Sequence, residues 1–300
     1  GKFMKLLILT QKIDRDDSIL GFFHSWIREF AGHYEKITVI ALGVGNYSLP
    51  DNVKVLSLGK EKGRSRLKYL WRFYKYIFQE RKNYEAVFVH MNQEYVFLGW
   101  PFWKFLRKKV FLWRNHPYGD IFTTLAVFLS NIVFCTSADA YVAKFKKTKL
   151  MPAGIDITKF KPQIPSLKIK NSLLYVGRIS PVKNLETLIE AARMLDKEGV
   201  NFTLNIVGGV SSQDKNYFQK IKKLSEDLEQ KGKIKFLGEV PNYKTPEIYN
   251  QNEILINLTP TGSFDKVILE AMACESLVLI SNKSFEGVLL NEFIFKEKNS

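Results

Sequence analysis

Two cations stand beside the predicted start of a helix. Arg178 and Lys183 lie in a short loop that follows an apolar run ending at Gly177. Asn184 is a plausible N-cap, and from Leu185 onward apolar residues recur at helical spacing. We therefore predict a strand, a loop and a helix, with the loop at the carboxyl end of a parallel sheet, where doubly wound folds bind ligands. Two cations beside a helix N-terminus suit a diphosphate; the alternative is a surface loop with two solvated charges.

A second loop with binding chemistry follows another apolar strand. Residues 259–263 are small and polar, so backbone amides at the start of the next helix can face an anion. Lys266 lies in the first turn of that helix, where a cation is unfavourable to the helix dipole, and this indicates a compensating ligand. Glu270 lies among apolar residues and needs hydrogen-bond donors, which the two hydroxyls of a ribose would supply. The alternative for Glu270 is a carboxylate on the exposed face of the helix.

Alternating strands and helices position both loops. This alternation predicts an α/β protein with parallel sheets and helices on both faces. A linker with Pro162 and Pro165 separates two series of elements, so we expect two Rossmann-like domains, residues 1–165 and 166–300, with a cleft between them. The predicted strands are residues 3–10, 36–42, 53–58, 86–90, 110–113, 132–135, 173–176, 202–207, 233–237, 254–258 and 277–280.

The composition of the chain indicates its cellular compartment and the kinds of partner that it could bind. Lys and Arg number 45 against 30 Asp and Glu, a formal charge of +15, which predicts attraction to nucleic acid, a phospholipid surface or phosphorylated ligands. Cys135 and Cys274 both lie in apolar runs, which favours a reducing compartment over a disulfide framework. The longest nearly apolar run, residues 123–134, is too short to span a bilayer. We expect a cytoplasmic protein, peripheral on the inner face of the cell membrane.

Three motifs in the second half carry a family resemblance. They are Val-Gly-Arg-x4-Lys-Asn at 176–184, Phe-Leu-Gly-x-Val at 236–240 and Gly-Ser-Phe-x4-Leu-Glu-Ala-Met-Ala at 262–273. In order and spacing they resemble the signature set of retaining GT-B glycosyltransferases, more narrowly glycosyltransferase family 4 (glycosyl transferases group 1). The resemblance implies a GT-B fold, with two Rossmann-like domains whose parallel sheets face a central cleft. The first domain would be the acceptor side and the second would bind a nucleotide sugar.

The resemblance also implies a role for each matched position. Arg178 and Lys183 would neutralise the diphosphate as it becomes the leaving group. His116, in Trp-Arg-Asn-His-Pro after a first-domain strand, would face the donor sugar across the cleft. Glu270 would hold the ribose, and backbone atoms near Val240 would read the base, for which uridine is the usual family choice. The other positions expected to bind the donor are Gly177, Gly262, Ser263, Phe264, Asp265 and Lys266.

Two departures from the family pattern stand out. Gly262 occupies the position of the family's first motif glutamate, eight residues before Glu270, so Asp265 or Lys266 would have to contact the sugar hydroxyls instead. The helices that normally close the family's second domain do not follow before residue 300.

The implied reaction moves a sugar from a UDP-sugar to a lipid-linked or glycan acceptor with retention, in cell-envelope or surface polysaccharide synthesis. No carboxylate is clearly placed on the opposite sugar face, so we favour same-face substitution. Asp14-Arg-Asp16 formally matches an Asp-x-Asp metal motif, but such a match is common by chance. The resembled fold class neutralises a diphosphate with cations and helix dipoles, so we expect no required metal and no required cofactor. The alternatives are a nucleotide-sugar epimerase of the same fold and a non-catalytic nucleotide-sugar binder. Candidate acceptor contacts are residues 14–17, Gly21, His90 and Asn92.

A basic stretch in the first domain indicates a surface partner. Residues 60–82 hold nine Lys or Arg and two Glu. One interpretation is a helix whose apolar face packs on the sheet while its cations are solvated. Residues 100–109 add aromatics beside cations, as interfacial helices do, so we expect an anionic membrane surface as a partner. No nucleic-acid-binding module is present, and we expect no nucleic-acid partner. The predicted inward face comprises Leu67, Leu70, Trp71, Tyr74, Ile77 and Phe78.

Overall fold

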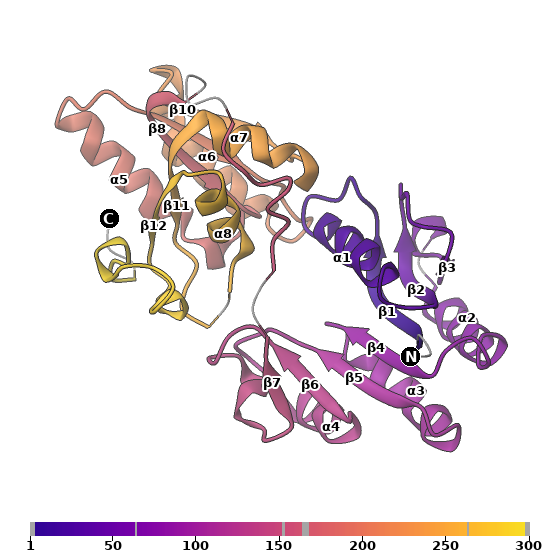
Figure 1. The fold of residues 1–300 in the computed structure, drawn as a ribbon. Coiled ribbons are helices and arrows are strands. Elements are labelled where there is room, and N and C mark those ends of the chain that lie inside the picture. Colours follow the sequence, from indigo (N-terminus) through magenta and orange to yellow (C-terminus); the bar gives the residue numbers. More distant parts are fainter. Residues whose placement is uncertain (1–3, 64, 152–153, 164–167, 263, 298–300) are drawn as a thin grey trace. The chain divides into compact units, whose positions relative to one another are not determined.

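The computed structural model describes residues 4–63, 65–151, 154–163, 168–262 and 264–297. The chain divides into two compact units, Gly1–Pro152 and Ala153–Ser300 (Figure 1). The predicted boundary between residues 165 and 166 falls on residues outside the described ones. Each unit is a parallel sheet with helices on both faces, as the alternation of strands and helices predicted.

The first unit is built on a seven-stranded parallel sheet of order β3-β2-β1-β4-β5-β6-β7. The chain runs outward from β1 to β3 and then crosses back to β4, so the switch of direction lies between β1 and β4. In such sheets ligands bind beyond the carboxyl ends of the strands near this switch. The strands are β1 Lys5–Ile13, β2 Lys36–Val44, β3 Val53–Ser57, β4 Ala86–His90, β5 Lys109–Trp113, β6 Ile132–Cys135 and β7 Thr148–Leu150.

The helices of the first unit divide between the two faces of this sheet. Alternate residues of β1 point to opposite faces: Leu6 and Ile8 pack with α1 (Gly21–Ala31), and Leu7 and Leu9 with the other helices. Those other helices are α2 (Arg66–Gln79), α3 (Glu94–Phe105) and α4 (Ile121–Leu129). Because the central strands are buried on both faces, their sequences are nearly continuous apolar runs.

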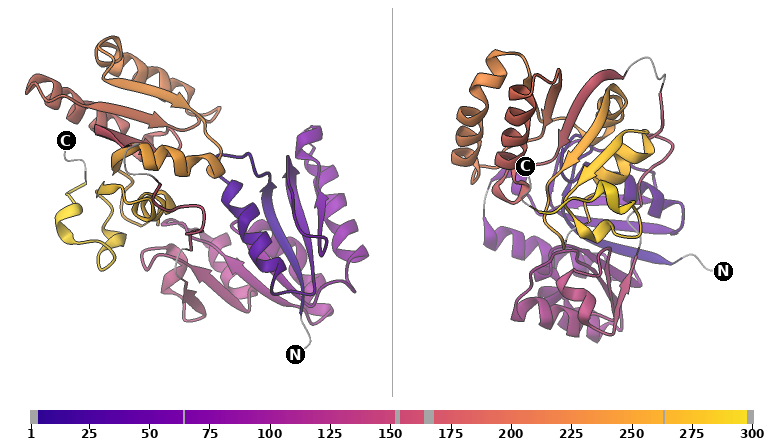
Figure 2. Two further views of the ribbon diagram at one scale, coloured as in Figure 1. Left: turned by 45° about the horizontal axis from the view of Figure 1, so that its top comes forward. Right: turned by 90° about the vertical axis from the view of Figure 1, so that its left-hand side faces the viewer.

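The second unit has a five-stranded parallel sheet of order β10-β9-β8-β11-β12 (Figure 2). Leu185 and Leu188 of α5 (Leu185–Lys197) and Ile221 of α6 (Lys215–Gln230) share one hydrophobic cluster. Tyr249 of α7 (Thr245–Gln251) and Ile268 of α8 (Lys266–Ala273) belong to another. The strands are β8 Ile169–Val176, β9 Thr203–Val207, β10 Ile234–Gly238, β11 Asn252–Asn257 and β12 Leu277–Ile280.

The structure corrects two details of the first unit. Strand β7 lacks a predicted counterpart, and β1 continues three residues beyond its predicted end because it stays paired with β2 through Ile13 and Val44. Both cysteines are free and buried, as their apolar surroundings predicted. Within the described residues, no helix combines the length and apolar character that crossing a bilayer demands.

Candidate functional site

The carboxyl ends of three strands in the second unit are joined by backbone hydrogen bonds. After β8, the N–H of Gly177 donates to Val207 O (3.0 Å) and that of Ile179 to Gly209 O (2.9 Å). After β9, the N–H of Gly208 donates to Gly238 O of β10 (2.8 Å). A Cβ on Gly208 would lie 1.8 Å from the carbonyl oxygen of Gly177, so only glycine permits this approach. Gly177 thus fixes the start of the loop that carries both predicted cations.

Lys183 connects that loop to the loop after β11. It ends a short 3₁₀ turn, and its Nζ donates to Thr259 Oγ1 (2.8 Å) and to Asp265 Oδ2 (2.6 Å). The same carboxylate oxygen accepts from Thr259 Oγ1 and from Asn257 Nδ2. Burial would raise the pKa of Asp265, but the Lys183 ammonium and these donors lower it below its ordinary value. Two motifs 82 residues apart in the chain therefore meet at one charged cluster.

Arg178 and Asn184 lie on either side of this turn. The side chain of Arg178 is exposed, at the carboxyl end of β8, where the sequence placed it. Asn184 precedes α5, but its side chain caps nothing: with φ of 51° it is left-handed, and Nδ2 donates instead to Leu258 O (3.0 Å). Asn184 is thus the N-cap residue of α5, as predicted, but its side chain makes no capping hydrogen bond. Its amide instead fastens the β8 loop to the β11 loop a second time.

Glu270 is buried on α8, so the alternative of an exposed carboxylate is wrong. Its Oε2 accepts from Tyr249 OH (2.9 Å) and its Oε1 from Asn242 Nδ2 (3.2 Å). Burial raises the pKa of Glu270, and these two donors and Lys266 offset only part of that shift. The protein thus supplies the donors that we expected from a ribose. Each carboxylate oxygen has a second lone pair, so acceptor capacity remains for a ligand.

The start of α8 carries the other predicted donor-binding positions. Lys266 is the first residue of the helix, and burial lowers its pKa to about 7, with Glu270 opposing the shift. Phe264 stacks on Phe285, with ring centroids 4.1 Å apart. The N–H of Gly262 donates to Ser284 Oγ (3.1 Å), and Ser263 lies outside the described residues.

The backbone at Gly262 explains the departure from the family motif. Its φ is 111°, in the region that residues with a Cβ rarely adopt. A glutamate at this position would be strained, so the loop and the missing carboxylate go together. Val240 follows β10 and is half-buried against the hydrophobic cluster that includes Tyr249 of α7 and Ile268 of α8.

Sequence reasoning missed three side chains of this site: Asn242, Tyr249 and Asn257. Asn257 offered a signal, because a polar residue at the end of a buried strand needs a partner. Asn242 and Tyr249 offered none, since a loop asparagine and an apolar-flanked tyrosine have many possible roles.

In the first unit, His116 lies on the loop after β5. The loop is anchored by Asn115, whose Oδ1 accepts from the backbone N–H groups of Thr136 and Ser137 after β6. The backbone of Tyr141 donates to His116 O (2.9 Å). The ring is exposed, and Nδ1 lies 2.9 Å from Tyr118 O and 3.1 Å from the backbone N of Tyr118. A proton on Nδ1 donates to that carbonyl and leaves Nε2 as an outward acceptor, whereas a proton on Nε2 lets Nδ1 accept from the backbone N–H and makes Nε2 an outward donor.

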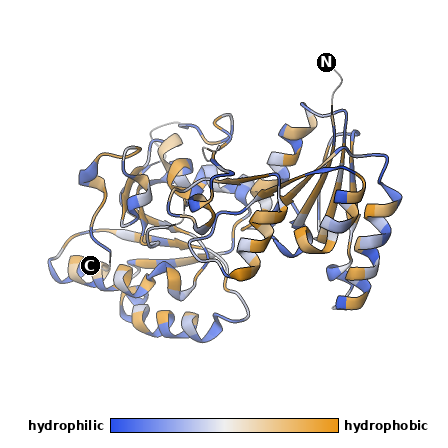
Figure 3. Ribbon diagram, turned by 90° about the horizontal axis from the view of Figure 1, so that it is seen from below, coloured by the Kyte–Doolittle hydropathy of each residue, from blue (hydrophilic) through white to orange (hydrophobic). Residues whose placement is uncertain are grey.

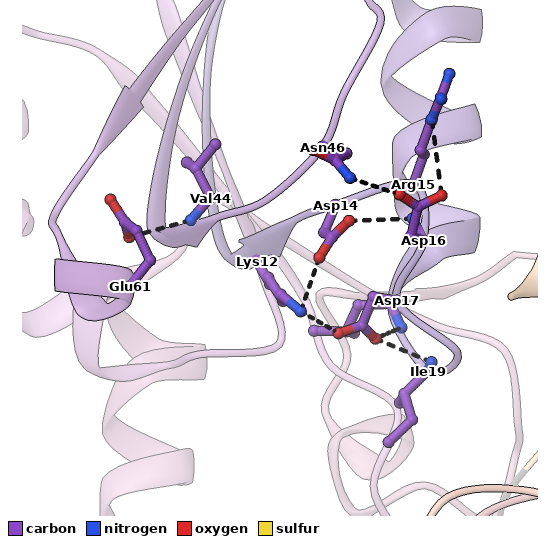
Figure 4. Close-up of polar contacts among 10 residues, drawn as sticks. Lys12, Asp14, Arg15, Asp16, Asp17, Ile19, Val44, Asn46 and Glu61 are labelled. Atoms are coloured by element: carbon purple, nitrogen blue, oxygen red, sulfur yellow. Dashed lines mark hydrogen bonds and ion pairs between the residues drawn. The ribbon is translucent and has the colours of Figure 1, made fainter. Parts of the chain in front are cut away.

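The acidic loop after β1 is tied to its own surroundings (Figure 4). Lys12 Nζ lies 3.0 Å from Asp14 Oδ2 and 2.7 Å from Asp17 Oδ2, while Asp16 accepts from Asn46 Nδ2 (2.8 Å). Burial would raise the pKa of Asp17, but Lys12 and backbone donors at the entry to α1 lower it. Gly21 meets the backbone of this loop, as its small size suggested. Within the described residues, no group of three or more His, Cys, Asp or Glu could hold a metal ion.

The two remaining acceptor candidates lie at the end of β4. His90 ends the strand itself and is buried, because its ring stacks on Phe23 with centroids 3.9 Å apart, and its Nδ1 contacts Thr10 Oγ1 (3.2 Å). The interpretation of His90 as an acceptor contact is therefore wrong. Asn92 follows the strand and is half-buried.

The clustered loops lie in a region that resembles a known family. Residues 156–294 match the family model described as glycosyl transferases group 1. This match covers most of the second unit and includes Lys183, Asp265 and Glu270.

Curated relatives match over part of their length. A D-inositol 3-phosphate glycosyltransferase of Frankia alni is 27% identical over 153 residues, 47% of this chain and 38% of that protein. The O-antigen chain mannosyltransferase B of Escherichia coli is 29% identical over 110 residues, 36% of this chain and 28% of the relative. The chain thus aligns with well under half of the length of these relatives.

Solved structures share the fold over almost the whole chain. Anabaena Alr3699/HepE, solved in complex with UDP and glucose, has a TM-score of 0.79 at 17% identity and covers 99% of this chain and 86% of that one. Sucrose-phosphate synthase from Thermosynechococcus elongatus has a TM-score of 0.73 at 16% identity. This match covers 96% of our chain and 84% of the synthase chain. The chain therefore has the two-domain α/β fold of GT-B glycosyltransferases.

Proposed function

We propose that this protein is a glycosyltransferase that moves a sugar from a UDP-sugar to a lipid-linked or glycan acceptor with retention. The observation that carries the proposal is the meeting of Lys183, Thr259 and Asp265 at the strand ends of the group 1 domain. Such a site, beside the N-terminus of α8 and the exposed Arg178, suits a diphosphate. The UDP and glucose bound to Anabaena Alr3699/HepE support a nucleotide-sugar donor.

In the proposed reaction, the bond between the sugar C1 and the diphosphate oxygen breaks, and a bond from C1 to the acceptor oxygen forms on the same face. The acceptor hydroxyl gives its proton to the departing diphosphate, so no protein base is required. Arg178 and Lys183 stabilise the negative charge that grows on the leaving group. Glu270 accepts from the ribose hydroxyls with its remaining lone pairs, the backbone near Val240 contacts the base, and His116 faces the sugar. Gly177, Gly262, Ser263, Phe264, Asp265 and Lys266 complete the donor site.

The chain's relatives and its charge support the proposed acceptor and cellular location. The E. coli relative is named as an O-antigen chain mannosyltransferase, which supports a role in cell-envelope or surface polysaccharide synthesis. The formal charge of +15 supports a peripheral position on the inner face of the cell membrane. Arg178, Lys183 and the N-terminus of α8 supply positive charge for a diphosphate, so the proposal includes no required metal and no cofactor.

The test is calorimetric titration of the chain with UDP, GDP and a panel of their sugars, followed by product analysis. We expect UDP and one UDP-sugar to bind, and slow hydrolysis in EDTA to release UDP and a sugar whose first-formed anomer, observed by NMR, keeps the donor's configuration. A new nucleotide sugar with an intact sugar–phosphate bond would indicate an epimerase. Binding of a nucleotide sugar without turnover on any acceptor would indicate a non-catalytic binder. Absence of binding to every nucleotide would refute the proposal.

A further inference from the structure

The positive charge of this protein belongs almost entirely to one unit. Residues 1–152 contain 25 Lys and Arg against 12 Asp and Glu, whereas residues 153–300 contain 20 against 18. Within the first unit, residues 60–152, which include α2, α3 and α4, hold 18 basic and six acidic residues. The unit that binds the nucleotide in our proposal is thus close to neutral, and the excess requires another explanation.

Helix α4 is apolar on all sides although half of it is exposed. Its nine residues include no charged side chain. Thr123, Ala126 and Val127 face the core, yet large hydrophobic side chains also point outward. A surface helix normally places polar residues opposite its buried stripe, so a helix that is apolar all round has a partner on its outer side. The exposed fractions are 77% for Ile121, 59% for Phe122, 45% for Leu125 and 75% for Phe128.

The buried face of helix α2 differs from the one that its sequence predicted. Phe73 and Ile77 are buried against the sheet, while Leu67 is 81% exposed, Trp71 63% and Phe78 55%. Of the six residues predicted to face inward, only Ile77 is buried. The helix therefore has two apolar stripes, and the sheet covers only the one that contains Phe73 and Ile77.

The outer stripes of α2, α3 and α4 form one continuous surface. Tyr74 OH donates to Leu98 O (3.0 Å), which joins α2 to α3, and the rings of Phe97 and Phe122 join α3 to α4 (centroids 6.2 Å apart). Figure 3 shows the three helices side by side on one side of the first unit, with hydrophobic residues along them. We call this surface the basic–apolar face.

Cations lie directly over the aromatic rings of this face. The cationic groups of four residues lie between 4.3 and 5.7 Å from ring centroids. This mixture of inserted rings and adjacent cations matches the boundary between acyl chains and anionic headgroups. The pairs are Lys75 with Trp71, Arg81 with Phe78, Lys104 with Trp100 and Lys147 with Phe128.

We propose that the basic–apolar face docks on an anionic lipid bilayer, with Leu67, Trp71 and Phe128 inserted and the surrounding Lys and Arg on the headgroups. Nucleic acid offers no apolar phase for aliphatic side chains such as Leu67 and Ile121. A second copy of the chain would oppose two strongly positive faces, and protein interfaces are depleted in lysine. The inference deepens the proposed function, on whose lipid-linked acceptor it rests, by naming the surface that meets the lipid.

The test is flotation of the full chain with vesicles of phosphatidylcholine alone or with added phosphatidylglycerol. No nucleotide or acceptor is present, so vesicle binding and nucleotide binding succeed or fail separately. One variant replaces Leu67, Trp71 and Phe128 with serine, and its control replaces the exposed Met194, Val200 and Leu290 of the second unit. A charge variant replaces Arg66, Lys68 and Lys75 with glutamine, and its control replaces the exposed Lys197, Lys223 and Lys235.

We expect binding only with phosphatidylglycerol, weakened when salt shortens the screening length from about 10 Å to about 3 Å. Each cation near an anionic surface strengthens binding about fivefold, so the charge variant should lose about a hundredfold. The serine variant should lose about as much because its inserted apolar area is gone. Both variants should bind UDP like the wild type, and both controls should bind vesicles like it. Equal binding to neutral vesicles, no binding to either, equal loss in the controls, or a dimer that the serine variant dissociates would overturn the proposal.

Discussion

Replacing Lys183 with methionine separates the two tasks that we assign to this side chain. Its ammonium holds Asp265 at 2.6 Å, and the two side chains are 17% and 18% exposed. Exposed ion pairs contribute up to about 1 kcal/mol to the free energy of unfolding, and breaking a buried pair lowers it by about 3 to 5 kcal/mol. Loss of this largely buried pair should therefore lower the free energy of unfolding by about 2 kcal/mol. A hydrogen bond to a charged group contributes about 1.5 to 3 kcal/mol, so the Kd for UDP should rise about 10-fold to about 150-fold.

The measurements are urea unfolding for stability and calorimetric titration for affinity. The matched control is Lys233→Met, because Lys233 pairs with Asp196 at 2.6 Å with 22% and 15% exposure, just before β10 and away from the strand ends that form the site. The Lys233→Met variant should lose less stability than Lys183→Met, because Asp196 keeps Lys231 as a partner. Its affinity for UDP should not change. The pKa of Asp265 lies below its ordinary value, so the carboxylate stays ionised from about pH 5 to 8. The stability that Lys183→Met loses with this ion pair should therefore be the same across that range.

A double variant completes this test. Lys183→Met with Asp265→Asn removes both charges, so it should recover part of the stability but none of the affinity for UDP. Wild-type affinity in Lys183→Met, or an equal loss of affinity in Lys233→Met, would show that the cluster around Lys183 does not bind the diphosphate.

Three further variants test neighbouring parts of the site. Arg178→Ala should weaken UDP binding by about 10-fold or more in calorimetry while leaving urea unfolding unchanged, because the side chain is exposed; a stability loss without an affinity loss would contradict this. Gly208→Ala should destabilise the chain by about 1 to 3 kcal/mol, since its Cβ would collide with the Gly177 carbonyl, and wild-type urea unfolding would disprove that contact. Glu270→Gln tests a pH dependence. Because the pKa of Glu270 is raised in the folded state, the wild type loses stability as the pH rises from 4.5 through the folded pKa. Thermal melting should therefore show the variant becoming more stable relative to the wild type over that range, while the variant binds UDP more weakly. A melting difference independent of pH would refute the last expectation.

Sequence reasoning was strongest where one residue type has one physical solution. Strands β4, β6 and β12 have the predicted ends, because short apolar runs between turn residues favour one assignment. The predicted position of Lys266 in the first turn of α8 was right as well. Side-chain partners were harder to predict. Lys183 and Asp265 were both expected near a donor, but their ion pair depends on how two loops converge, which spacing along the chain does not encode.

Helix α2 shows why periodicity alone can mislead. Trp71 and Phe78 lie on one apolar stripe and Phe73 and Ile77 on another, and both stripes satisfy helical spacing. Which stripe faces the sheet depends on the shape of the neighbouring strands and helices. The same ambiguity affected His90, whose position at a strand end suited a ligand contact, while stacking on Phe23 buries it.

The backbone hydrogen bonds across β8, β9 and β10 have a consequence for motion at these strand ends. The amides of Gly177, Ile179 and Gly208 belong to one connected set of hydrogen bonds spanning three strand ends. Local openings of such a set are cooperative, so these amides should exchange with deuterium through a shared event rather than three separate ones. A ligand that engages Arg178 would then slow exchange at the end of β9 as well, at residues it never touches.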